Sequence, residues 1–128
     1  MNTLYFVRLF DYTYWAHRRL WHCVMQLSAE QFSRPSSYSI GSVHQQIVHT
    51  LGAEEVWLQR IHGTSPSSFP QPAELPTRTD IRIRWDAIEK DWRRYLDRLE
   101  DTDLEKPVTF RLIKDTSERT AVLSDILG

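Results

Sequence analysis

The sequence has little of several features that mark common protein classes. It contains one cysteine, Cys23, so neither a disulfide framework nor a thiolate cluster for a structural metal can form within it. Its 16 Lys and Arg residues nearly cancel its 17 Asp and Glu residues, and the net charge of −1 excludes the basic excess that non-specific nucleic-acid binding requires. The longest apolar run, Leu4 to Val7, is too short for a membrane span or a signal peptide. These absences predict a cytoplasmic protein with no nucleic-acid partner and no membrane partner.

Several catalytic signatures are missing as well. The chain has no glycine-rich phosphate loop after a strand, no Gly-x-Ser-x-Gly elbow and no His-Glu-x-x-His pair. Cys23 stands among bulky neighbours in a helical pattern, and a lone thiol in that setting is predicted to be a small core residue rather than a nucleophile.

The chain does have the length of one domain and many aromatic residues. Its 128 residues predict a single domain spanning 1–128, and a hydrophobic content of 41% with 26% charged residues is typical of a globular protein. Five Trp, five Tyr and five Phe supply large side chains for its core.

Apolar residues recur at steps of three and four along the first segment, as they do on the buried side of an amphipathic helix. This stripe predicts a helix that includes residues 7–24, with His17 on its buried side. A short helical turn at 29–32 is expected to follow, with Ser28 as its N-cap.

Two further helices are predicted by the same spacing. The second begins near Gly41 or Ser42 and ends at Gly63, and it carries small residues on a second face. The third spans roughly residues 80–99, and Glu89 is assigned to its solvent-exposed side.

The segments between and after these helices have other patterns. Residues 64–76 hold four of the six prolines and predict a long crossover. Residues 108–122 alternate about a polar turn and predict a β-hairpin. With Ser124 as a possible cap, the last residues start another apolar helical pattern. The chain is therefore expected to form an all-α four-helix bundle whose fourth helix lies largely beyond Gly128.

The five histidines do not form a chelating pair on any one helix. His17 and His22 are five residues apart, as are His44 and His49, and five residues turn a side chain by about 140° around a helix axis. A metal ion would therefore have to be held between helices.

The histidines also have simpler interpretations. His17 and His49 are each either a metal ligand or a core histidine bonded to a backbone carbonyl or a Tyr, and spacing alone favours the core. His44 and His62 suit surface or cap positions, and His22 an exposed one. Glu54 and Glu55 in the second helix are placed to orient an imidazole.

Two stretches resemble a known family. The first helix contains Tyr12-x-x-Trp15-Ala16-His17, close to a Tyr-Asn-x-Trp-Ala-Asn signature in which Thr13 and His17 replace the two asparagines. The second contains His49, then Ala53-Glu54-x-x-Trp57-Leu58-x-Arg60 and Gly63. In this order and at these intervals, the motifs resemble those of the DinB/YfiT-like superfamily of four-helix bundles.

The resemblance implies a divalent metal ion, nickel or zinc, held by three histidines. One ligand comes from the second helix and maps onto His49, and two come from a His-x-x-x-His motif on the fourth helix, expected soon after residues 123–128. With the resemblance included, His49 is interpreted as a metal ligand, on condition that the fourth helix is complete. Family members use a low-molecular-weight thiol as co-substrate, and they often form homodimers.

Two functions remain open at this point. The first is a metal-dependent thiol S-transferase or hydrolase that acts on a small-molecule electrophile. The alternative is a non-catalytic, stress-related helical bundle or oligomerisation module with an incomplete metal site.

Overall fold

A computed structural model describes residues 2–36 and 41–128. Most of these residues are helical, and the rest include one small β-hairpin, which confirms the helical class predicted from the sequence. In chain order the elements are α1 (Thr3–Met25), α2 (Ala29–Ser33), α3 (Val43–Ile61), the 3₁₀ turn η1 (Pro72–Glu74), α4 (Arg78–Arg98), the 3₁₀ turn η2 (Asp101–Glu105), β1 (Pro107–Arg111), β2 (Glu118–Val122) and α5 (Leu123–Leu127).

The helices begin where local side-chain chemistry satisfies their first backbone N–H groups. Ser28 caps α2, as the sequence predicts, and Ser42 caps α3, where the sequence predicts only that a helix starts; each cap is part of a capping box. Gly63 follows the end of α3 with φ of 94°, a left-handed conformation that favours glycine. The prediction for Ser124 is wrong, because Val122 is the N-cap of α5 and no side chain caps that helix.

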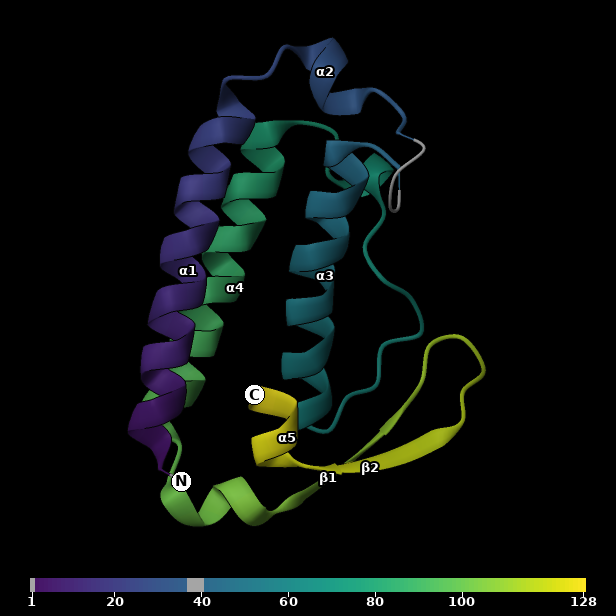
Figure 1. The fold of residues 1–128 in the computed structure, drawn as a ribbon. Helices are drawn as coiled ribbons and strands as arrows, with labels where there is room; N and C mark the ends of the chain where they lie inside the picture. The colour runs from purple at the N-terminus through teal and green to yellow at the C-terminus, as the bar shows by residue number, and fades with distance from the viewer. Residues whose placement is uncertain (1, 37–40) are drawn as a thin grey trace.

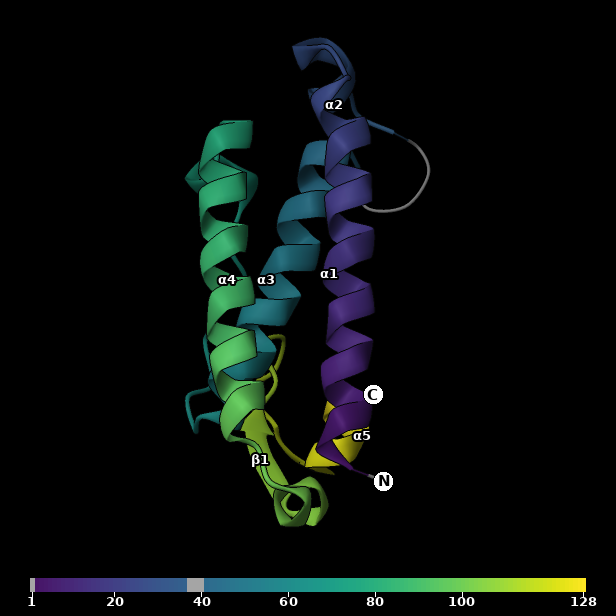
Figure 2. The ribbon, with the colours of Figure 1, turned by 90° about the vertical axis from the view of Figure 1, so that its left-hand side faces the viewer.

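The three long helices α1, α3 and α4 stand side by side, but they do not alternate in direction (Figure 1). The chain runs up α1, down α3, back up through the crossover and down α4 (Figures 1 and 2). Because α3 and α4 run the same way, residues 64–77 must return the full length of the bundle, which explains the long proline-rich segment predicted there.

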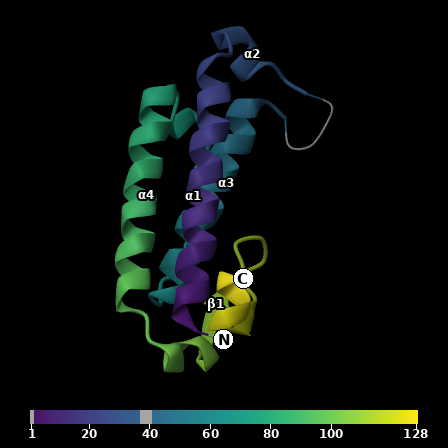
Figure 3. The same ribbon diagram turned by 60° about the vertical axis from the view of Figure 1, so that its left-hand side comes forward.

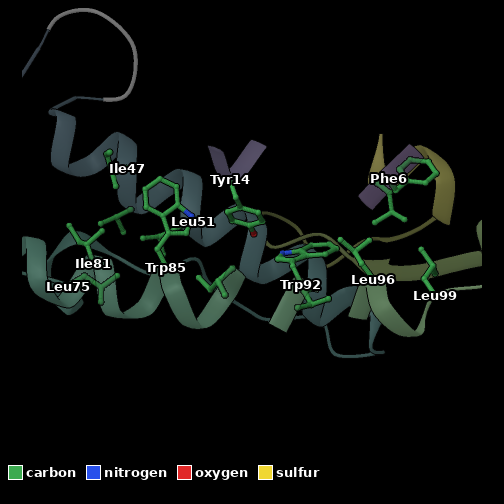
Figure 4. Packing of buried hydrophobic residues seen from close by; sticks show 14 of the residues in the cluster. Phe6, Tyr14, Ile47, Leu51, Leu75, Ile81, Trp85, Trp92, Leu96 and Leu99 are labelled. Carbon is green, nitrogen blue, oxygen red and sulfur yellow. The ribbon is translucent and has the colours of Figure 1, made fainter. Parts of the chain in front are cut away.

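The core lies along α4, which packs against both α1 and α3. Trp85 and Tyr14 are each 1% exposed, and Leu51 is completely buried. Figure 4 shows Trp85, Tyr14 and Trp92 following one another along this core. The stripes predicted from three-four spacing therefore do face the interior.

The hairpin and α5 close one end of the molecule. Thr109 pairs with Thr120 in an antiparallel register, and Phe110 on β1 turns its ring toward α3. Figure 3 shows α5 beside the first turns of α1. Within the described residues, no helix combines the length and apolarity that a membrane crossing needs.

Candidate functional site

His49, the predicted metal ligand, lies on an exposed part of α3. Its ring packs against the ring of Phe69 in the crossover, with 5.4 Å between the ring centroids, and neither ring nitrogen has a hydrogen bond within the described residues. The sequence places this imidazole in the middle of the bundle, but the structure places it at the surface. The reason is rotational, since the buried Leu51 lies two positions further along α3, or about 200° around the helix axis from His49.

The described residues do not by themselves fit a three-histidine metal ion. Among residues 2–36 and 41–128, no three His, Cys, Asp or Glu side chains come close enough to hold one. His49 is a possible single ligand, and one imidazole alone does not make a site.

A polar network inside the bundle joins the three long helices. His17 Nε2 on α1 donates to Glu54 Oε1 on α3 over 2.9 Å, and the indole Nε1 of Trp85 on α4 donates to Glu54 Oε2 over 2.8 Å. The backbone carbonyl of Glu54 accepts a further bond from Trp92 Nε1. Only 16% of the His17 side chain and 18% of the Glu54 side chain are exposed.

This network changes the interpretation of His17. The simpler sequence interpretation gave His17 a backbone carbonyl or a Tyr as its partner, but its partner is the carboxylate of Glu54. Of the two carboxylates expected to orient an imidazole, Glu54 contacts one, whereas Glu55 pairs with Arg84 instead. Because a carboxylate only accepts, the proton of the bond between His17 and Glu54 is on Nε2.

Tyr14 lies against this network with its hydroxyl buried. Its ring centroid is 5.5 Å from that of His17, and its hydroxyl has no hydrogen-bond partner within the described residues. Burial raises the pKa of Tyr14 well above its usual range, and the nearby charges of Glu54 and Glu89 raise the pKa further. The phenol is therefore neutral at all physiological pH values.

Glu89 corrects a second expectation. The sequence assigns it to the solvent-exposed side, but the residue is only 8% exposed. Its Oε2 accepts from Arg18 over 2.5 Å and from Arg93 Nε over 2.8 Å. Arg93 also donates to Asp11, and the bonds to Asp11 and Glu89 raise the pKa of Arg93. Glu89 is buried because α1 covers this side of α4 and brings Arg18 to it.

A small groove lies next to the His17 network. It has a volume of about 140 Å³, and its lining includes Leu20 from α1, Thr50 from α3 and Trp85 from α4. Since the indole of Trp85 bonds to Glu54, the groove and the network share a side chain. The sequence did not reveal this site, because its parts come from three distant segments.

Arg60, from the second motif, is buried without a carboxylate partner. Its guanidinium carbon lies 4.7 Å from the ring centroid of Trp57 and 4.8 Å from that of Phe110. Its Nε has no partner in the described part of the chain, and burial lowers the pKa of the guanidinium. Arg60 therefore links α3 to β1 through the ring of Phe110 and through a hydrogen bond from Nη2 to the carbonyl of Arg111 over 3.4 Å.

The other candidate residues have ordinary surroundings. His62 caps the end of α3, and His22 is exposed and contacts Gln26, as predicted. His44 is partly buried instead of lying at the surface, because it bonds to the carbonyl of Leu75. The prediction for Cys23 is wrong, since this thiol is exposed on a side of α1 that no described element covers.

Comparison with known proteins gives one clear match. The family model described as the DinB family matches residues 1–126, nearly the whole chain, which confirms the resemblance found in the sequence. None of the curated proteins compared with the chain matches it.

Proposed function

The chain belongs to the DinB family, and on that premise we propose that it is a metal-dependent enzyme, a thiol S-transferase or a hydrolase acting on small electrophiles. His49 would supply one ligand of a nickel or zinc ion. The observation that supports this role is the imidazole of His49, which the motif resemblance maps onto the family's ligand and which has both nitrogens free of hydrogen bonds in the described residues. A low-molecular-weight thiol would be the co-substrate.

The proposal requires two ligands that the described residues do not supply. We propose that α5 is the first turn of the fourth helix of a four-helix bundle and that the ligands follow it. Two histidines four residues apart would project from one side of that helix. Gly52, in the next turn of α3 after His49, is already packed against Pro70 of the crossover, so such a helix would have to approach His49 from another side.

Metal content tests this role of His49 directly. The protein expressed from its full reading frame should carry about one nickel or zinc ion per chain, and the His49→Ala variant should carry none, because two remaining ligands bind too weakly. The matched control is His22→Ala, an exposed histidine of α1, which should keep its metal. Stoichiometric metal in His49→Ala, or none in the unaltered protein, would contradict the proposal.

A specific observation favours a second candidate, a non-catalytic, stress-related module that associates as a homodimer. One long helix, α1, exposes at least half of several large apolar side chains: Leu4, Tyr5, Tyr12, Trp15 and Leu20. A folded, metal-free dimer in light scattering, with an unchanged mass for His49→Ala, would support this module and exclude the enzyme.

A further inference from the structure

A second groove lies between α3 and α4 and takes no part in the site above. Its volume is about 380 Å³, within the range of small-molecule sites in proteins. Its lining comes from α3 and α4 alone, with no residue of α1 and without His49. The groove therefore shares no lining residue with the proposed metal site.

The floor of this groove is apolar. It is formed by Leu58 from α3 and by Ala87, Ile88 and the ring of Tyr95 from α4. Leu58 and Ile88 belong to the buried core, so the floor is held in place by packing beneath it. The ring of His62, which also lines the groove, meets that of Tyr95 edge-on, with 5.6 Å between the centroids. A floor of this kind suits an aromatic or aliphatic body.

Around the floor, arginine outnumbers carboxylate. Arg84, Arg94 and Arg98 line the groove together with Glu55 and Asp91, which leaves an excess of one positive charge. Two nitrogens of Arg84 bond to the carboxylate of Glu55, over 3.0 and 2.6 Å, so this pair is already satisfied. Arg94 lies 3.7 Å from Asp91, and Arg98 has no ion pair or hydrogen bond within the described residues.

We propose that this groove binds a small organic monoanion with an apolar body, such as an arylalkyl carboxylate. The unpaired guanidinium of Arg98 would receive the carboxylate, since its planar fork matches the two oxygens. The apolar floor would take the body of the ligand. A single excess charge suits a monoanion better than the dianion of a phosphate ester. The hydroxyl of Tyr95 is a protonated donor at neutral pH, and burial and the charge of Asp103 raise its pKa further, to about 12.

An NMR titration of the metal-free 128-residue chain tests the proposal with three probes: 4-phenylbutanoate, the neutral 4-phenylbutanamide and inorganic phosphate. We expect 4-phenylbutanoate to shift the backbone amides of Ala87 and Tyr95. The amide analogue should bind about tenfold more weakly because it lacks the charge, and phosphate should not bind because it lacks the apolar body.

Two variants test separately the charged residue and the apolar floor of the groove. Arg98→Gln should weaken 4-phenylbutanoate binding about tenfold, and Ala87→Trp, which fills the groove from an exposed position, should abolish the binding. The control Arg119→Gln removes an exposed arginine of the hairpin and should change nothing. Equal binding of acid and amide, unchanged affinity in both groove variants, or no shifts at about 10 mM ligand would overturn the proposal.

Discussion

His17 Nε2 lies 2.9 Å from Glu54 Oε1, although 37 residues separate the two in the sequence. The second oxygen of the same carboxylate accepts the indole N–H of Trp85. One carboxylate on α3 therefore links α1 and α4, at a depth where solvent competes weakly for its oxygens. This residue fixes the rotation of three helices about their axes more directly than apolar packing does.

Removing that carboxylate should destabilise the protein. Glu54→Ala leaves the N–H groups of His17 and Trp85 without their acceptor, and each unsatisfied buried group costs about 1–3 kcal/mol, so we expect a loss of at least about 2 kcal/mol in the free energy of unfolding. Urea denaturation measures this loss. The control His22→Asn, which changes an exposed histidine, should stay within about 0.5 kcal/mol of the unaltered protein. Equal effects of the two variants would contradict the role of Glu54.

Because the hydroxyl of Tyr14 is buried, we expect the stability of the folded protein to decrease at alkaline pH. Its folded pKa is raised above the ordinary 10.0, so the stability that its neutral form contributes is complete below pH 10.0 and is lost as the pH rises toward the folded pKa. Tyr14→Phe removes an unpaired group, so it should be neutral or stabilising at pH 7.

Unfolding measured at pH 7 and at about pH 11 separates the two effects. The unaltered protein should lose more stability between these values than Tyr14→Phe does. The matched control Tyr12→Phe, at a position that is 65% exposed, should behave like the unaltered protein. A Tyr14→Phe variant that lost as much stability as Tyr12→Phe would show that the phenol does not resist ionisation.

Replacing Gly52 by alanine should have an effect on stability opposite to the usual one in a helix. Gly→Ala within a helix normally stabilises by about 0.5–1 kcal/mol. Here a Cβ would lie only 2.9 Å from Cδ of Pro70 in the crossover, so we expect Gly52→Ala to destabilise by about 1 kcal/mol. In a Pro70→Ala background the obstruction is gone and the same change should stabilise. Thermal unfolding of the four proteins tests this, and additive effects would contradict it.

Much of the fold could be predicted because its signals are local. Ser42 and Gly63 mark the two ends of α3 through groups within a few residues of each, and the alternation at 108–122 sets the hairpin. Such signals depend on the neighbouring backbone and not on which helix lies opposite.

The burial of individual side chains could not be predicted in the same way, because it depends on which helices pack against each other. Glu89 is buried because α1 brings Arg18 to it, and Cys23 is exposed because no described element covers its side of α1. A three-four stripe identifies one buried face but not a second, so the burial of these polar and small residues could not be obtained from spacing.

The motif that identified the family is made largely of residues that hold the fold together. Glu54 joins three helices, Arg60 contacts two aromatic rings, and Gly63 allows the turn after α3. His49 differs, since its only described contact is with Phe69. The match at Glu54, Arg60 and Gly63 is therefore evidence for the fold. A chemical function has to be tested at His49.

The pairing of α1 with α4 bears on the order in which the polypeptide acquires its structure. Ion pairs such as that between Asp11 and Arg93 join positions 82 apart, so a very large loop must close before α1 gains its main support. The segment from α3 through the crossover to α4 has shorter-range contacts and should assemble first, with α1 docking onto it late. Burial of Trp21 on α1 should therefore lag behind formation of the contact between Glu55 on α3 and Arg84 on α4.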